Sequence, residues 1–312
     1  MIFCWLLALF VLSASSQRHY LSFCIVFKDE AAYLDEWIEF HRLLGVSQFH
    51  FYNNESRDKS AALLQRHVAA GHATLTDWPT RTAGSAVTTQ CDAYAHCLRS
   101  FGNDSRWMGF FDVDEFLYPQ RPQDRALPDV LRQFEQYGGV VVRNALFGSS
   151  GFINKPDGLV SENYVFRAPL EHPTYAEDED DVLYHVKSIV DARHGVGCGK
   201  FGAHVVFLDD PALFLVNERG ERHVADGKNA PKGMAYVDLL RYNHYKAKSK
   251  ADWDKKKSKG TVQGAPAVKK FAKLGNQWRN VDRNEVLDES VHRFLPALRR
   301  ALGLKEGQYA QG

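Results

Sequence analysis

The sequence predicts an α/β protein with a mostly parallel sheet flanked by helices. Short apolar runs of strand length alternate with segments whose apolar residues recur every three or four positions, and this alternation requires crossovers between parallel strands. The 312 residues are 45% hydrophobic and 25% charged, which is the composition of an ordinary folded chain. A formal net charge of +1 provides no general attraction to nucleic acid, so we expect no nucleic-acid partner.

The first part of the chain contains three predicted strands and two predicted helices. The run YLSFCIVF over 20–27 is apolar, of strand length and rich in β-forming residues. Apolar positions three and four residues apart predict a helix over 31–44, which Gly45 ends. The elements that follow are a strand over 49–52, a helix over 60–70 and a strand over 74–78. We expect the carboxyl ends of these strands to meet at one edge of the sheet, where α/β proteins bind ligands.

The rest of the chain continues the same pattern. A predicted helix over 90–101 leads into a buried strand over 107–111, WMGFF, which runs directly into the acidic sequence DVDE. The later elements are a helix near 126–137, a β-rich run over 139–147 and an amphipathic helix over 286–304.

A lysine-rich stretch, KAKSKADWDKKKSK, occupies residues 246–259. Such a run is usually a solvated helix face or a loop, and here a lid over a bound diphosphate is the alternative. Within and after it, Trp253 and Trp278 stand in polar surroundings. Either these indoles stack on a sugar or they pack under a loop.

The N-terminus carries a single apolar run, IFCWLLALFVLSA, over 2–14. It resembles the hydrophobic region of a signal peptide, although no basic residue precedes it, and it is shorter than the roughly 20 residues of a membrane span. We expect residues 1–17 to direct entry into the secretory pathway, as a cleaved signal or as an anchor that associates the protein with the membrane. If the start codon is misplaced, the protein is cytoplasmic instead.

Five cysteines are too few for a disulfide framework in a chain of this length. None of them shows the CxxC spacing of a zinc site. Any disulfide is therefore expected to be incidental to the fold. The cysteines are Cys4, Cys24, Cys91, Cys97 and Cys198.

Three acids at the end of an apolar strand are the strongest chemical signal. Asp112 and Asp114 are two positions apart, so on a pleated strand their carboxylates project to the same side, and Glu115 follows. Two such carboxylates can share Mg²⁺ or Mn²⁺, whose remaining positions commonly hold water and phosphate oxygens. A lone DxD also occurs by chance in polar turns, but here other polar residues lie at neighbouring strand ends. These residues are Lys28, Asp29, Glu30, Asn53 and Asn54.

Several ordered motifs together resemble glycosyltransferase family 92, a group of metal-dependent glycosyltransferases with the GT-A fold. The stretch CIVFKDEAAYLDEWIEFHRLLGVSQFHFYNNES is similar to the family's strand, Lys-Asn-Glu, Glu-Trp-Ile-x-x-His helix and Tyr-Asp-Asn-x-Ser turn. WMGFFDVDEFLYP is similar to its DxDE strand. HVKSIVDARHGVGCGKFGAHV and YNHYKAKSKADWDKKKSKG are similar to its C-terminal half, so the resemblance covers roughly residues 20–260.

The resemblance implies a division of the chain into three parts. After the signal or anchor over 1–17, a GT-A glycosyltransferase domain occupies 18–260. A helical extension over 261–312 is expected to pack on that domain.

The resemblance also implies roles for individual residues. Asp112, Asp114 and His244 are implied ligands of the metal, Mn²⁺ or Mg²⁺. The implied binding site for the UDP-sugar donor consists of Lys28, Asp29, Glu30, Asn53, Asp112 and Lys246. Two of these positions depart from the family, since Asp29 stands where it has Asn and Asn53 where it has Asp.

The implied reaction is inverting transfer of a hexose, most commonly galactose from UDP-galactose, to a glycan acceptor. Inversion needs a general base after the metal motif, and Glu171, Asp178 and neighbouring acids are candidates. We favour Glu171 as the catalytic base because its LEHP context is less solvated than the nearby EDEDD run. Two other classes stay open, a metal-dependent phosphohydrolase that acts on nucleotide-sugars and a non-catalytic glycan-binding protein with this fold.

Overall fold

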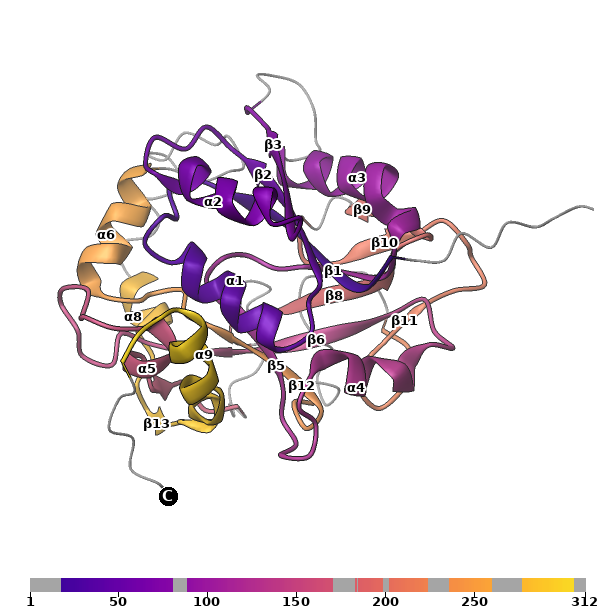
Figure 1. Cartoon of the computed structure of the whole chain (residues 1–312). Coiled ribbons are helices and arrows are strands. Elements are labelled where there is room, and N and C mark those ends of the chain that lie inside the picture. The colour runs from indigo at the N-terminus through magenta and orange to yellow at the C-terminus, as the bar shows by residue number, and fades with distance from the viewer. Residues whose placement is uncertain are drawn as a thin grey trace, which may run out of the picture.

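The computed structural model describes residues 18–80, 89–170, 183, 185–198, 202–223, 236–259 and 277–305. One twisted central sheet carries helices on both faces (Figure 1). In spatial order its strands are β3 (Ala73–Asp77), β2 (Gln48–Asn53), β1 (His19–Phe27), β4 (Ser105–Phe110), β8 (Val186–Asp191), β6 (Gly139–Leu146), β12 (Leu240–His244) and β5 (Glu115–Pro119), with β11 (Leu215–Val216) beside β6. The predicted α/β class is therefore confirmed.

The sheet combines parallel and antiparallel pairs. Strands β3, β2, β1 and β4 are all parallel, so their carboxyl ends share one edge. Strand β8 is antiparallel to both β4 and β6, and β5 is antiparallel to β12. Two short ribbons accompany the sheet, β9 (Gly195–Cys198) with β10 (Val206–Leu208), and β7 (Phe166–Arg167) with β13 (Val286–Leu287).

Two apolar cores cover the faces of the sheet. The larger one packs α1, α2, α4 and α9 on one face, and the smaller one packs α3 and the β9–β10 ribbon on the other. The helices are α1 (Leu34–Leu43), α2 (Ser60–Ala69), α3 (Thr89–Phe101), α4 (Leu127–Leu131), α5 (Val160–Asn163), α6 (Lys250–Lys259), α8 (Gln277–Val281) and α9 (Leu295–Ala301). Short 3-10 turns are η1 (Gly102–Asp104), η2 (Arg132–Phe134) and η4 (Ser290–Phe294).

Most predicted elements of the first half are confirmed within a few residues. The expected strands over 20–27, 49–52, 74–78 and 107–111 are β1, β2, β3 and β4, and the β-rich run over 139–147 is β6. The expected helices over 31–44, 60–70 and 90–101 are α1, α2 and α3.

Two predicted helices are wrong in extent. The helix expected near 126–137 is α4 followed by the 3-10 turn η2. The helix expected over 286–304 begins only at Leu295, because Val286 and Leu287 pair with β7 and Pro296 cannot occupy a helix interior. The implied boundary after residue 260 stays a prediction. The segment beyond it does contact the rest of the chain, since the centres of the Phe294 ring and the Phe40 ring of α1 are 5.9 Å apart.

None of the helices in the described residues is long and apolar enough to span a bilayer. The apolar run over 2–14 lies outside the described residues.

Candidate functional site

Asp112 lies at the carboxyl end of β4 and is held from two other elements. Its Oδ1 accepts a hydrogen bond from Gln90 Nε2 of α3 at 2.8 Å, and its Oδ2 lies 2.9 Å from Lys187 Nζ of β8. The side chain still keeps 38% of its surface exposed. The Asp112 carboxylate is therefore both oriented and accessible to a ligand.

Glu115 is the last residue of the acidic turn over 112–115 and is hydrogen-bonded to its first residue, Asp112. Its N–H donates to the Asp112 carbonyl at 2.9 Å, and its Oε2 accepts from the Asp112 N–H at 2.9 Å. The same oxygen lies 3.1 Å from Lys187 Nζ, which is only 2% exposed. Burial raises the pKa of Glu115 to about 8, although the Lys187 ammonium favours its charged form. Burial lowers the pKa of Lys187, but Asp112 and Glu115 outweigh it and hold that pKa well above its usual value.

Asp114 is buried and pairs with the lysine-rich helix. Its Oδ2 lies 2.6 Å from Lys256 Nζ of α6, and its side chain is 9% exposed. Burial would raise the pKa of Asp114, but the neighbouring cationic groups, Lys256 foremost with Lys248, and the hydrogen bond from Lys256 together hold that pKa well below its usual value, so the carboxylate is ionised. Its backbone carbonyl accepts from the Tyr245 N–H at 2.8 Å, which joins the turn to the end of β12.

His244 reaches the acidic turn through the register of β12 and β5. The antiparallel pairing places it directly opposite Glu115. Its Nε2 lies 3.8 Å from Asp114 Oδ1 and 4.0 Å from Glu115 Oε1. Burial holds the pKa of His244 well below its usual value, so the imidazole is neutral near pH 7. Its Nδ1 is buried without a hydrogen-bond partner among the described residues.

The turn after β1 forms the second part of the site. Asp29 has a left-handed backbone, with φ of +55°, and its Oδ1 accepts from the N–H groups of Arg57 at 2.6 Å and Asp58 at 3.3 Å. Asn and Asp are the non-glycine residues that adopt this conformation most readily. Asp29 can therefore replace the family's Asn without a change in the backbone.

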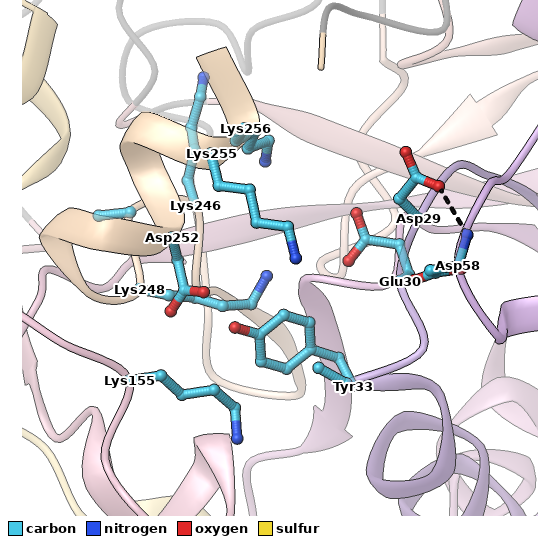
Figure 2. A pocket seen from close by; sticks show the side chains of 12 residues that line it. Asp29, Glu30, Tyr33, Asp58, Lys155, Lys246, Lys248, Asp252, Lys255 and Lys256 are labelled. Carbon is cyan, nitrogen blue, oxygen red and sulfur yellow. Dashed lines mark hydrogen bonds between the residues drawn. The ribbon is translucent and has the colours of Figure 1, made fainter. Parts of the chain in front are cut away.

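A pocket lies between this turn and α6, as Figure 2 shows. Its ionisable lining residues are the lysines Lys155, Lys246, Lys248, Lys255 and Lys256 and the acids Asp29, Glu30, Asp58 and Asp252. The ammonium groups of Lys248 and Lys255 point into the space between α6 and the Asp29–Glu30 turn. Five lysines against four acids leave the lining with a small excess of positive charge, and its ammonium groups suit an anion with several oxygens, such as a diphosphate.

Lys248 is the most unusual cation of the pocket. It is 5% exposed, has φ of +49°, and holds its Nζ 4.1 Å from the centre of the Tyr33 ring. Burial lowers the pKa of Lys248. In the part of the chain that the structure describes, its ammonium forms no direct ion pair.

The structure brings together most of the predicted site residues. Asp29, Glu30 and Lys246 line the pocket, whereas Asp112, Asp114 and His244 form the adjoining acidic cluster. Lys256 belongs to both groups. Lys28 and Asn53 lie at the same sheet edge but do not line the pocket. The Asn53 side chain donates a hydrogen bond to Asp77 and accepts one from the Ser56 N–H.

Two further sequence predictions have different outcomes. Glu171 lies outside the described residues, so its role as base stays a prediction. Trp253 is buried against Ala247, Val281 and Trp278 in a small apolar cluster, which favours packing over sugar stacking.

The implied metal does not fit the cluster in this arrangement. The donor chemistry is suitable, because carboxylate oxygens and a neutral imidazole can all bind Mn²⁺. However, Asp114 is paired with Lys256 and Asp112 with Lys187. No group of three or more acidic, His or Cys side chains among the described residues is arranged to hold a metal ion.

Sequence reasoning missed the two residues that hold Asp112. Lys187 has a recognisable signal, because a lysine in the apolar run of β8 needs a buried partner. Gln90 has no such signal, since only the folded chain places α3 beside the end of β4.

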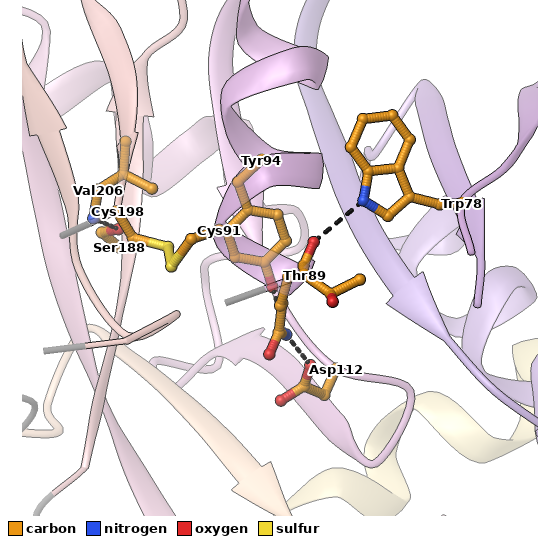
Figure 3. The surroundings of a disulfide bond; sticks show 9 residues. Trp78, Thr89, Cys91, Tyr94, Asp112, Ser188, Cys198 and Val206 are labelled. Carbon is orange, nitrogen blue, oxygen red and sulfur yellow. Dashed lines mark hydrogen bonds between the residues drawn. A yellow bond between two sulfur atoms is a disulfide. The ribbon is translucent and has the colours of Figure 1, made fainter. Parts of the chain in front are cut away.

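A disulfide joins Cys91 of α3 to Cys198 of β9, next to Gln90 (Figure 3). The Trp78 indole N–H donates to the Thr89 carbonyl at 3.0 Å and fixes the same helix end. The prediction that any disulfide is incidental to the fold stays a prediction, although this bond joins the helix that carries Gln90 to the β9–β10 ribbon.

The fold and the site together define an α/β protein with an acidic strand end beside a cationic pocket. The model of glycosyltransferase family 92 matches residues 19–194, which is more than half of the chain. The chain belongs to glycosyltransferase family 92, as its motifs predicted. The sheet, with its helices on both faces, agrees with the GT-A class that this family implied.

Curated relatives come from plants. A family 92 protein of Ricinus communis is 26% identical over 306 residues, a match that covers 90% of this chain and 46% of the relative. A family 92 protein of Oryza sativa is 30% identical over 162 residues, covering 50% of this chain and 26% of the relative. The chain thus spans about half or less of the length of these relatives.

Two solved structures show distant likeness to the chain. Residues 1–349 of Staphylococcus aureus TarS, in complex with UDP, have a TM-score of 0.33 and 10% identity, covering 55% of this chain and 47% of that chain. Mycobacterium tuberculosis glucosyl-3-phosphoglycerate synthase, in complex with Mn²⁺, UDP and glucosyl-3-phosphoglycerate, has a TM-score of 0.28 and 18% identity, covering 42% and 45%. These scores are too low to transfer a ligand to this chain.

Proposed function

We propose that this chain is an inverting glycosyltransferase that transfers a hexose from a UDP-sugar to a glycan acceptor, with galactose as the expected sugar. The observation that carries the proposal is the junction of the acidic turn with the cationic pocket. Lys256 both lines the pocket and binds Asp114 at 2.6 Å. Family membership supports the same reaction class.

The lysines of the pocket supply the electrostatic part of this reaction. When the acceptor hydroxyl oxygen attacks the anomeric carbon, the bond from that carbon to the phosphate oxygen breaks and negative charge develops on the leaving UDP. Fixed ammonium groups stabilise such charge best where it develops, in a site with little water. Buried Lys248 and exposed Lys255 are placed to do so.

The proton of the acceptor hydroxyl goes to a carboxylate, which we propose is Glu171. General base catalysis of this kind contributes on the order of 10²- to 10⁴-fold. We therefore expect Glu171→Gln to lower the transfer rate by about this factor while UDP binding persists. A full transfer rate in this variant would assign the base to another acid.

The test of the function is a panel of UDP-sugars assayed with and without a glycan acceptor, in Mn²⁺ and in EDTA. Asp114→Ala is expected to lower transfer by about 100-fold or more. Asp104→Ala is the matched control, because Asp104 precedes the opposite end of β4. Transfer from one sugar, retained in this control, would support the proposal and identify the donor.

Two outcomes would replace the proposal. Hydrolysis of the nucleotide-sugar that no acceptor accelerates would indicate a phosphohydrolase. Calorimetric binding of oligosaccharides without any binding of UDP would indicate a non-catalytic glycan-binding protein.

We also propose that the protein enters the secretory pathway, with its catalytic part in the lumen. The Cys91–Cys198 disulfide supports this location, because such bonds persist in oxidising compartments. Membrane association through residues 2–14 stays a prediction. N-terminal sequencing of the mature protein would show whether residues 1–17 are removed.

A further inference from the structure

We propose that Trp37 and His41 of α1 are positioning residues, which hold the acidic turn over 112–115 in place from the outer edge of β5. The inference starts from two hydrogen bonds. The Trp37 indole N–H donates to the Glu115 carbonyl at 2.8 Å, and the Leu117 N–H donates to His41 Nε2 at 3.1 Å. Both side chains are fully buried. As a statement about catalysis, the inference rests on the proposed glycosyltransferase function.

Strand β5 ends the spatial order of the described sheet, and β12 pairs with one of its edges. Backbone groups of successive strand residues point to opposite edges. The Asp114 carbonyl faces β12, since it accepts from the Tyr245 N–H at 2.8 Å. Glu115 and Leu117 therefore present their backbone groups to the other edge, where they need partners. Side chains of α1 supply these partners in place of a further strand.

The spacing of the two side chains on α1 fits this edge. Helix positions four apart lie on one face and about 6 Å apart along the axis. Strand positions two apart are separated by about 6.6 Å. Trp37 and His41 are therefore in register with Glu115 and Leu117, so that one donor meets a carbonyl and one acceptor meets an N–H.

The hydrogen bonds of His41 determine its tautomer. Its Nδ1 lies 2.8 Å from the Trp37 carbonyl, which can only accept, so Nδ1 carries the proton. Nε2 then has a free lone pair for the Leu117 N–H. Burial lowers the pKa of His41 to about 3, so the ring is neutral near pH 7. The contact between α1 and β5 is thus complete without any charge.

Glu115 connects this anchor to Asp112. Its N–H donates to the Asp112 carbonyl at 2.9 Å, and its Oε2 accepts from the Asp112 N–H at 2.9 Å. Helix α1 begins directly after Tyr33, whose ring lines the pocket and has its centre 4.1 Å from Lys248 Nζ. One helix therefore carries a wall of the pocket and the anchor of the acidic turn. Misplacement by about 1 Å can cost about 10²-fold in rate, so this anchor matters for transfer.

The experiment removes the acceptor for the Leu117 N–H. His41→Phe keeps a ring of similar size without a lone pair. His41→Gln is the rescue variant, because its amide oxygen is as many bonds from Cα as Nε2 is. With UDP-galactose as the expected donor, kcat should fall about 10- to 100-fold in the Phe variant while KM for the donor stays within about threefold. The Gln variant should recover kcat to within about threefold of the unmodified protein.

His50→Phe is the matched control. His50 of β2 is also buried, burial lowers its pKa to about 3, and its Nδ1 lies 3.0 Å from Thr74 Oγ1. Its ring stacks on Phe101 at the end of α3 that lies away from Gln90. This variant should lose stability but keep kcat within about threefold of the unmodified protein. All assays are run below the unfolding transition, as determined by circular dichroism.

Hydrogen exchange tests the anchor without any turnover. Backbone amides over 112–119 should exchange at least about tenfold faster in His41→Phe than in the unmodified protein, and at the unmodified rate in His41→Gln and His50→Phe. Trp37→Phe, which loses only the N–H bonded to Glu115, should change exchange and kcat in the same direction. It replaces His41→Phe if that variant does not fold.

The inference is overturned if exchange over 112–119 stays the same in these variants. It is also overturned if exchange accelerates while kcat for transfer stays constant. Faster exchange in His41→Phe, together with no transfer from any UDP-sugar by the unmodified protein, would refute the proposed function alone. Transfer at one kcat by the unmodified protein and all variants would refute this inference alone.

Discussion

At the scale of single residues, Asp112 shows how an exposed carboxylate is oriented before a ligand arrives. The Gln90 amide and the Lys187 ammonium bind its two oxygens from different elements. A side chain held in this way loses little conformational freedom when a ligand binds, and this favours precise contacts with the UDP-sugar donor. We therefore treat Gln90 as a residue that positions Asp112.

Gln90→Leu tests this role. The variant loses the hydrogen bond of 2.8 Å to Asp112 Oδ1 but keeps a side chain of similar volume. Hydrogen-bond partners that orient metal-ligating side chains are worth about 10- to 100-fold in metal affinity or activity, and Asp112 is an implied metal ligand. Because Lys187 remains, we expect the affinity for UDP in Mn²⁺ to fall about tenfold, as measured by calorimetry.

Gln120→Leu is the control for that measurement. Gln120 also donates a side-chain hydrogen bond, to the Tyr118 carbonyl, but lies after the far end of β5. Its substitution should leave UDP affinity within about twofold of the unmodified protein, since it is remote from the site. Equal affinities in both variants would show that Asp112 does not need Gln90.

At the scale of elements, a disulfide crosslinks the start of α3 to a distant strand. Cys91 and Cys198 close a sequence separation of 107 residues and join α3 to the β9–β10 ribbon (Figure 3). A crosslink over so long a loop restricts the unfolded chain considerably. The bond is therefore expected to stabilise the fold as well as the position of Gln90.

Reduction of this disulfide should lower the free energy of unfolding by about 2–4 kcal/mol. The measurement is urea unfolding with and without reductant, on the unmodified protein and on Cys91→Ser/Cys198→Ser. The reductant should bring the unmodified protein to the stability of the double variant and leave that variant unchanged. The remaining described cysteines, Cys24 and Cys97, are buried and reduced, so they give no competing signal. Unchanged stability on reduction would contradict the expectation.

At the scale of the whole molecule, the last described segment is tied to the sheet by buried charges. Asp288 lies 2.6 Å from Arg167 of β7 and 3.0 Å from Arg241 of β12. Ser290 Oγ donates to the same carboxylate at 2.5 Å. Burial favours the neutral acid, but the charge of Arg241 and the hydrogen bonds from Ser290 and Arg167 together outweigh it and lower the pKa of Asp288. The cluster therefore joins three segments that are distant in sequence.

Asp288→Asn should destabilise the protein by on the order of 3 kcal/mol at pH 7, because buried Arg241 and partly buried Arg167 lose their counter-charge. An acid with a lowered pKa in the folded state stabilises the fold above its unfolded pKa, and this contribution is lost as the pH falls through the folded pKa. The difference in free energy of unfolding between the unmodified protein and Asp288→Asn should thus have its full size at pH 7 and decrease below about pH 4. Urea unfolding across this range measures it.

Asp238→Asn provides the comparison for an exposed pair. Asp238 is 70% exposed and lies 3.4 Å from Arg219. Its loss should cost less than about 1 kcal/mol at any pH. If the two variants behave alike, the Asp288 cluster does not stabilise the fold.

The sequence by itself determined the strands and helices of the first half, the acidic end of β4 and the family. These features depend on residues that are near one another in the chain, so periodicity and motif spacing reveal them. Asp112, Asp114, Asp29 and Glu30 were found in this way.

Only the tertiary structure decided which groups meet at the acidic turn. His244 faces Glu115 because β12 and β5 pair in one register, and Lys187 reaches Asp112 because β8 lies beside β4. Lys256 reaches Asp114 across 142 residues of sequence. Contacts between distant segments follow from strand pairing and helix packing, and local patterns do not encode them. For that reason the sequence predicts a carboxylate pair for a metal, whereas the folded chain shows each of those carboxylates already paired with a lysine.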